Sequence, residues 1–109
     1  MIISHINQYH KGWFVGDFSP ALYKNKEFEI AHHRHKMGEQ TFSHFHQLTT
    51  ELNYIIKGKL KVSWHILQEG DIWIYQPGDV SDVEFLSDSE LIVVRWPSIP
   101  TDKYEANRP

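Results

Sequence analysis

The stretch that decides the fold runs from residue 38 to residue 58 and reads GEQTFSHFHQLTTELNYIIKG. It holds two histidines, His44 and His46, separated by a single residue. Residues two apart on a β-strand point to the same side, so the two imidazoles face one way together. Glu51 follows on what the pattern predicts to be the next strand. Two imidazoles and one carboxylate suit Fe(II), Mn(II), Ni(II) or Zn(II) and leave coordination positions open for water or substrate.

The rest of the chain has the pattern of an all-β protein. Gly and Pro recur at short intervals, and KLKVSW at 59–64 alternates apolar and polar residues. Short segments rich in Val, Ile, Phe, Tyr and Trp lie between the turn residues, at 28–35, 51–57, 59–67, 71–76 and 90–96. Such alternation, with turn signals every 8–12 residues, predicts an antiparallel sandwich or barrel.

Length and composition limit the class of protein. The 109 residues suffice for one domain, and a chain that is 40% hydrophobic and 14% aromatic is not disordered. The chain has no apolar run long enough to span a membrane, and its N-terminus lacks the pattern of a signal peptide, so we expect a cytoplasmic protein without a membrane partner. It has no cysteine, which excludes disulfides, thiolate metal sites and a cysteine nucleophile.

The charge pattern argues against nucleic acid as a partner. The formal net charge is −3, and the longest basic stretch, residues 32–36, consists mostly of imidazoles that are neutral at pH 7. Phosphate binding needs a concentrated positive surface, which this chain lacks. The eight histidines are the unusual feature, and imidazole is the commonest nitrogen ligand for metals.

Here the sequence resembles a known family. Gly38, five residues, His44-x-His46, four residues, Glu51, six residues and Gly58 match every fixed position of the first cupin motif. This resemblance covers roughly residues 28–96.

The second cupin motif is only partly present. Gly70 opens it and Pro77-Gly78 closes its turn, but Gln76 stands at its proline position. Ser81 stands where the fourth metal ligand of the family, a histidine, belongs.

Three outcomes are open for the fourth ligand position. A bulge after the turn could bring Asp82 inward as a carboxylate ligand, water could complete a three-ligand metal, or affinity could be so low that no metal is held. Strict alternation points Ser81 inward and Asp82 outward, and a bulge would reverse this parity. Otherwise Asp82 is expected to be a turn residue that bonds its own backbone.

The resemblance implies a double-stranded β-helix, the cupin form of the jelly roll, with a divalent metal (Fe, Mn, Ni or Zn) inside one open end. We therefore expect a single cupin domain over residues 1–109, in which residues 1–27 and 97–109 are arms. The resemblance also implies a homodimer, an arrangement that covers exposed edge strands.

Several residues near the expected metal are candidates for further roles. Asn53 shares a face with Glu51, so it could orient that carboxylate, contact substrate or bond neighbouring backbone. In the family the strand holding His35 lines the barrel, which makes His35 a candidate catalytic acid or base; a surface or dimer-contact role is the alternative. Trp64 and Tyr75 are candidate substrate-binding aromatics, unless they fill the core or a dimer interface.

Two kinds of function follow. The first is a metal-dependent enzyme acting on a small molecule, with carbohydrates among the candidates and with isomerase, epimerase, decarboxylase or dioxygenase chemistry open. The second is a non-catalytic module that binds or senses a small molecule or sugar with a degenerate metal site, as the absent histidine at Ser81 suggests. A cupin that has only a structural role and no metal is the third and weakest interpretation.

Overall fold

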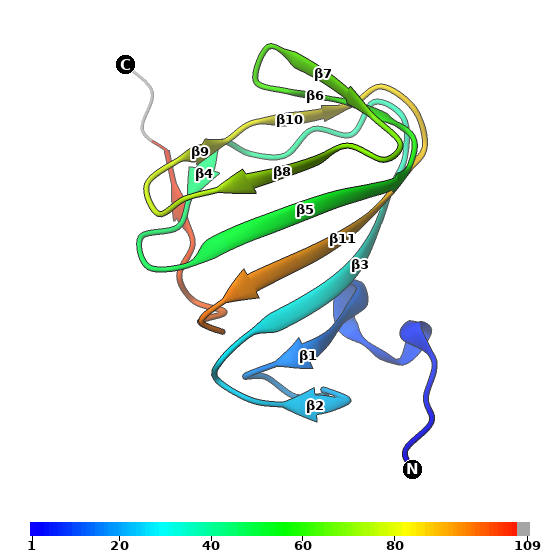
Figure 1. Cartoon of the computed structure of the whole chain (residues 1–109), viewed down its shortest axis with the longest axis vertical. Coiled ribbons are helices and arrows are strands. Elements are labelled where there is room, and N and C mark those ends of the chain that lie inside the picture. Colours follow the sequence, from blue (N-terminus) through cyan, green and yellow to red (C-terminus); the bar gives the residue numbers. More distant parts are fainter. Residues whose placement is uncertain (107–109) are drawn as a thin grey trace.

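The computed structural model describes residues 1–106, which form short strands joined by turns (Figure 1). The strands are β1 Trp13–Gly16, β2 Tyr23–Lys24, β3 Glu29–His35, β4 His44–Phe45, β5 Thr50–Lys57, β6 Lys59–Val62, β7 His65–Gln68, β8 Ile72–Tyr75, β9 Val80–Ser81, β10 Val83–Phe85, β11 Ser89–Trp96 and β12 Tyr104–Glu105. Two 3₁₀ turns, η1 Ile6–Gln8 and η2 His10–Gly12, precede them.

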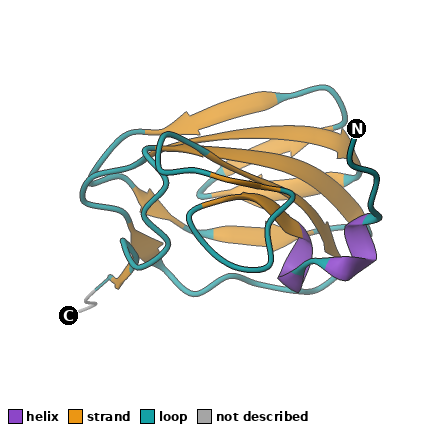
Figure 2. Cartoon of the chain, turned by 90° about the horizontal axis from the view of Figure 1, so that it is seen from below, coloured by secondary structure: helices purple, strands orange, loops and turns teal. Residues whose placement is uncertain are grey.

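The strands form two layers. One layer is a six-stranded sheet in the order β2-β1-β3-β11-β5-β8. The other consists of two three-stranded sheets, β10-β6-β7 and β12-β4-β9. Figures 1 and 2 show the large sheet curving beneath the smaller ones, with the two 3₁₀ turns against one end. The all-β prediction is confirmed, and none of the helices within residues 1–106 is long and apolar enough to cross a membrane.

The core lies between the layers, where alternate residues of each strand point. In β6 the pattern is regular: Leu60 and Val62 are buried, while Lys59 and Lys61 are exposed. The strand expected to continue through residue 64 ends at Val62, where a turn leads into β7. The buried cluster consists of Ala31, Ile55, Leu60, Val62, Tyr75, Val83, Phe85, Leu91 and Val93.

Gly58 connects β5 to β6 in a conformation that other residues rarely adopt. Its φ is +104°, and a Cβ placed there would lie 2.2 Å from Ser89 Oγ. The glycine that ends the first motif is therefore required by the backbone and by the close approach of the β11 strand.

The segments outside residues 28–96 also contribute strands. β1 pairs with β3 and extends the large sheet, and β12 pairs with β4 beside the first motif. The chain after β11 is fastened at Ser98, whose hydroxyl accepts a hydrogen bond from the Asp17 N–H at 2.8 Å. Both segments thus pack against the central strands.

Candidate functional site

The motif residues His44, His46 and Glu51 lie together at one end of the two layers. His44 is on β4, His46 follows it, and Glu51 is near the start of β5. All three side chains are buried, with at most 8% of each residue exposed. The two imidazoles meet edge to face with ring centroids 5.5 Å apart, so the shared orientation predicted for them is observed.

Backbone carbonyls fix the orientation of both imidazoles. His44 Nδ1 donates to the Phe42 carbonyl at 2.7 Å, and His46 Nδ1 donates to the Asp102 carbonyl. A neutral imidazole that donates from Nδ1 carries a lone pair on Nε2, which is the atom that can bind a metal. Burial also lowers the pKa of His44, which favours its neutral form.

The Nε2 atom of His46 is the least satisfied atom of the site. It is buried and has no hydrogen-bond partner among the described residues, yet it lies 3.5 Å from Glu51 Oε1. A lone pair facing a carboxylate oxygen across this gap is unfavourable. A proton on Nε2 or a cation between the two atoms would relieve it.

Glu51 is ionised and held by two donors. Asn53 Nδ2 donates to Oε2 at 3.0 Å, and Arg95 Nε donates to Oε1 at 2.6 Å. Burial alone would raise the pKa of Glu51, but its contacts with His46, Arg95 and Asn53 bring it to about 2. Of the three roles considered for Asn53, the structure shows the hydrogen bond that orients Glu51.

Arg95 was not predicted as a site residue. Arg95 is on β11 and lies between Glu51 on β5 and Glu29 on β3, so an acid, a base and an acid form one row across three strands. Its guanidinium carbon lies 4.6 Å above the ring of Trp13. Its sequence signal was its place in the alternation, because Arg95 continues the series of inward positions that holds the apolar residues Leu91 and Val93.

Ser81, at the position of the missing histidine, faces inward. It pairs with His44 across β4 and β9, is buried, and bonds the Tyr75 hydroxyl at 3.2 Å. Asp82 is exposed, because Ser81, Asp82 and Val83 keep strict alternation and the bulge needed to reverse them is not present. This corrects the expectation of Asp82 as a metal ligand. Tyr75 does lie at the site, because it is paired with Glu51 across β5 and β8 and its hydroxyl contacts Ser81.

The donor atoms suit a divalent ion in chemistry, since they comprise two Nε2 lone pairs and an ionised carboxylate. The arrangement is not a closed cage: within residues 1–106, no three His, Asp or Glu side chains are grouped so as to hold a metal as they stand. Glu51 is instead paired with Arg95. His44, His46 and Glu51 are the residues that would hold an ion, and Arg95 competes with it for Glu51.

His35 does not reach this site. It ends β3 six residues beyond Glu29, about 20 Å at the usual strand rise. Its ring stacks on Phe85 at 4.0 Å, and Nδ1 lies 2.8 Å from a Glu39 carboxylate oxygen.

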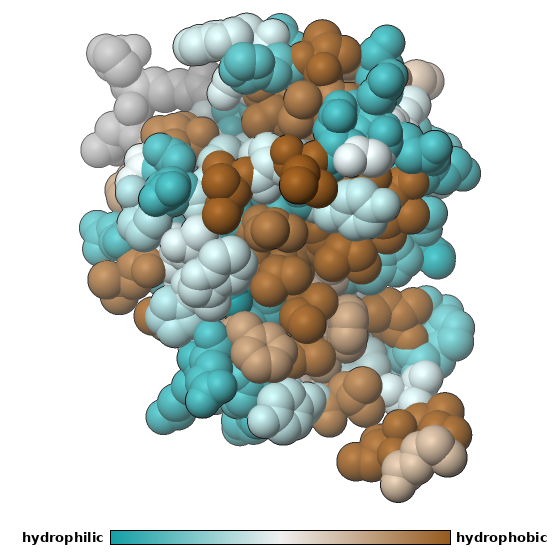
Figure 3. All heavy atoms as spheres, viewed as in Figure 1, coloured by the Kyte–Doolittle hydropathy of each residue, from teal (hydrophilic) through white to brown (hydrophobic). Residues whose placement is uncertain are grey.

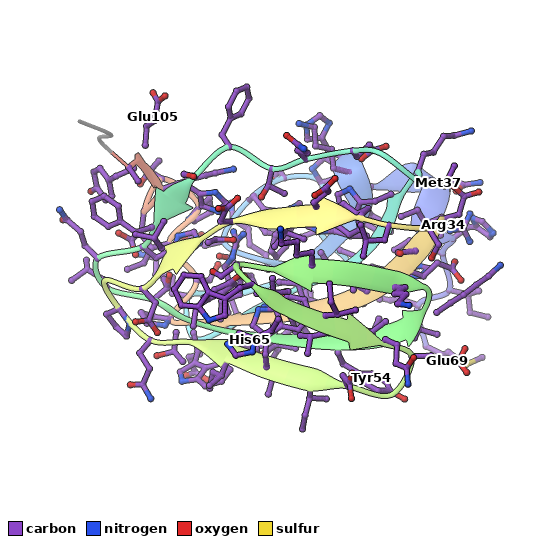
Figure 4. The ribbon with its side chains drawn as sticks, turned by 90° about the horizontal axis from the view of Figure 1, so that it is seen from above. Arg34, Met37, Tyr54, His65, Glu69 and Glu105 are labelled. Carbon is purple, nitrogen blue, oxygen red and sulfur yellow. The ribbon has the colours of Figure 1, made fainter. Side chains whose placement is uncertain are left out.

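Figure 4 shows the same separation: Arg34 and Met37, which flank His35 in sequence, lie at the opposite end from Glu105, the partner of His44 in the β12–β4 pair. This corrects the expected catalytic role of His35, because a seven-residue strand carries its end out of the site.

Trp64 lies at the same end of the molecule as Ser81, because the N–H of its neighbour Ser63 donates to the Asp82 carbonyl at 2.8 Å. It lies in the turn between β6 and β7, next to His65, and is 83% exposed. The early end of β6 leaves the indole in solvent, and the expected role of Trp64 in substrate binding stays a prediction.

Asp102 is a second residue that the sequence interpretation missed. Its carboxylate accepts hydrogen bonds from the backbone N–H groups of Gln47, Leu48 and Thr49 at 2.9–3.0 Å. Burial would raise the pKa of Asp102, but these three donors hold it below its usual value. The chain after β11, expected to be an arm, thus fixes the turn between His46 and Glu51.

Comparison with solved structures identifies this architecture. A conserved protein with a double-stranded β-helix domain from Klebsiella pneumoniae superposes with a TM-score of 0.69 at 19% identity, covering 77% of this chain and 74% of that one. The chain has the cupin fold.

Two further solved structures support the cupin fold. KdgF from Halomonas sp. has a TM-score of 0.65 at 18% identity, covering 69% of this chain and 73% of that one. A cupin sugar phosphate isomerase from Silicibacter pomeroyi has a TM-score of 0.61 at 20% identity, covering 75% and 58%. No family model and no curated protein sequence matches.

Proposed function

We propose that this cupin is a metal-dependent enzyme that acts on a small, oxygen-rich molecule, with His44, His46 and Glu51 as its metal ligands. The supporting observation is the buried Nε2 of His46, which has no hydrogen-bond partner among the described residues and lies 3.5 Å from Glu51 Oε1, so that a cation held by both atoms would satisfy them. A divalent ion there would act as a Lewis acid on an oxygen of the bound molecule. The likeness to a protein named as a sugar phosphate isomerase favours a carbohydrate-related substrate.

A second candidate is a binding module without catalysis. Two observations favour it: Arg95 already supplies a positive charge to Glu51, and Ser81 has replaced the fourth ligand and is bonded to Tyr75. In this case the barrel would capture its ligand without an ion.

Titration of metal-free protein with Co(II) tests the first proposal against the second. The enzyme proposal predicts one Co(II) ion per chain, with the visible absorption of a site that has histidine ligands. In Glu51→Gln the Co(II) affinity should be at least about 100-fold lower, because even residues that only support a metal ligand change metal affinity by up to about 100-fold. Glu90→Gln is the matched control, because Glu90 pairs with Arg34 on the other face of the sheet. Wild-type protein that binds Co(II) no better than Glu51→Gln would favour the binding module.

We also propose that the protein is a homodimer that uses the outer face of the large sheet. Tyr54, Ile72 and Ile74 on β5 and β8 are 42–66% exposed, and Figure 3 shows apolar side chains gathered across this face. A contiguous apolar face of this kind marks an interaction surface, and a second copy would cover it symmetrically. Light scattering should give the mass of a dimer, and Ile72→Lys should give that of a monomer; a monomeric wild type would refute the proposal.

A further inference from the structure

A cavity of about 350 Å³ lies beside the candidate site. Trp13, Phe18, Pro20 and Pro100 form apolar walls, so the cavity is made by the N-terminal segment and by the chain after β11. Glu29 and Arg95 supply its charged groups. The volume is near the lower end for small-molecule pockets, which suits a compact ligand.

Glu29 is the buried carboxylate among the residues that line the cavity. It is only 2% exposed, and its Oε1 has no hydrogen-bond partner among the described residues. Such a buried acceptor is costly to leave unsatisfied. The nearest positive group, Arg95 Nη1, is 3.9 Å from this oxygen, which is too long for a hydrogen bond.

One hydroxyl group would bridge this gap. Because Glu29 Oε1 is almost fully shielded in this structure, a hydroxyl would reach it only after the Arg95 side chain shifts. An oxygen about 2.8 Å from both atoms could then donate its hydrogen to Glu29 Oε1 and accept one from Arg95 Nη1. An anionic group would face the Glu29 carboxylate, and an ammonium group would face the Arg95 guanidinium. A neutral hydroxyl avoids both conflicts because it is donor and acceptor at once.

We infer that this cavity binds a compact, neutral polyhydroxylated molecule of monosaccharide size, anchored by one hydroxyl between Glu29 and Arg95. Its C–H faces would lie against the apolar walls that Trp13 and Phe18 provide. Since Arg95 also bonds Glu51, the ligand would sit next to the metal ligands, and in this link the inference rests on the proposed function.

The indole N–H signals of full-length, ¹⁵N-labelled protein provide the test. The chain has four tryptophans, and Trp13→Phe assigns the signal of the one that lines the cavity. Titration with myo-inositol and D-glucose should shift the Trp13 signal and leave in place that of Trp64, which does not line the cavity. Propionate and propylamine, which carry one charge each, should shift neither the Trp13 signal nor the Trp64 signal.

Substitution of the anchor separates the ligand site from the metal site. Glu29→Gln should weaken the polyol about 10-fold or more, since hydrogen bonds to charged groups contribute about 1.5–3 kcal/mol, while Glu90→Gln should not. Both polyol titrations are run with chelator present, and Co(II) binding is measured on the same Glu29→Gln protein. If Glu29→Gln loses polyol binding but still binds Co(II), the result supports the polyol site independently of the proposed metal site.

The inference is overturned if neither polyol shifts Trp13, meaning that only water occupies the cavity, or if Glu29→Gln binds them as well as wild type. Should Glu29→Gln fail to fold, His10→Trp replaces it. His10 is exposed and lines the same cavity, so a larger ring there should obstruct the polyol without disturbing the core. Unchanged polyol affinity in His10→Trp would then count against the inference.

Discussion

Asp102→Asn should destabilise the protein more than an Asp→Asn substitution in an ordinary turn, where the carboxylate accepts a single hydrogen bond. The Asp102 carboxylate accepts three backbone hydrogen bonds from residues 47–49, and its own carbonyl accepts from His46. Asparagine is the same size but is neutral and can present only one acceptor oxygen. The change therefore removes the negative charge from the hydrogen bonds that remain, and it places the asparagine NH₂ group, a donor, against backbone N–H groups that are also donors.

The magnitude follows from the number of bonds. Hydrogen bonds to charged groups contribute about 1.5–3 kcal/mol, against about 0.5–1.5 kcal/mol for neutral pairs, so three such bonds lose roughly 1 kcal/mol each. The expected loss in free energy of unfolding is about 3 kcal/mol, or about 12 °C in Tm for a domain of this size. Because His46 is anchored to the same residue, Co(II) affinity should fall about 10-fold as well.

Asp71→Asn is the matched control. The Asp71 carboxylate accepts one hydrogen bond, of 2.8 Å from the Gln68 N–H, in an exposed turn between β7 and β8. Its replacement should cost about 1 kcal/mol and leave Co(II) binding unchanged. Urea unfolding followed by tryptophan fluorescence measures both variants, and the ratio of the two losses should be near three.

The pH dependence gives an independent check. The pKa of Asp102 is lowered in the folded protein, so its contribution is present above the unfolded pKa of about 3.9 and is lost as pH falls through the folded value. Wild type and Asp102→Asn should therefore converge in stability below about pH 4. Equal losses in the Asp102 and Asp71 variants at pH 7, or a gap that persists undiminished at pH 3, would refute the reasoning.

Three further variants probe the site and the fold. Ser81→His combined with Tyr75→Phe, which frees the space of the present hydroxyl pair, should strengthen Co(II) binding at least about 10-fold by restoring the fourth ligand; unchanged affinity in titration would show that this position does not reach the ion. Arg95→Met should cost about 3–5 kcal/mol in unfolding measurements by stranding buried carboxylates, and saturating Co(II) should raise Tm more in this variant than in wild type; an equal rise would argue against competition for the carboxylate. Gly58→Ala should lower the free energy of unfolding by about 1–3 kcal/mol because its Cβ would meet Ser89 Oγ, and a thermal melt like that of wild type would contradict the strained-turn argument.

Local patterns were enough to predict the class of fold. Alternation such as that of Leu60 and Val62 depends only on which face of a strand is buried, and the sheet confirms it. The end of β6 was placed too late because Trp64 continues the alternation by type, whereas the chain turns at Ser63 with a positive φ of 55°. Where a strand stops depends on its partners, which a single segment does not encode.

The site was predicted only as far as its ligands are neighbours in sequence. The motif brings His44, His46 and Glu51 together because one short turn joins their strands. Arg95 and Asp102 come from the far end of the chain, and only the pairing of β11 with β5 and the path of the chain after β11 bring them to the site. Conversely, His35 was placed at the site because the length of β3 was not taken into account.

These non-local residues decide what the motif can do. The ionised Glu51 needs a cation nearby, and in this structure Arg95 supplies it at 2.6 Å. A metal ion would meet the same need and also satisfy the Nε2 of His46, which the guanidinium does not. A complete first motif is therefore compatible with either cation. Whether the site holds a divalent ion depends on its competition for Glu51 with Arg95, which also lies beside buried Glu29.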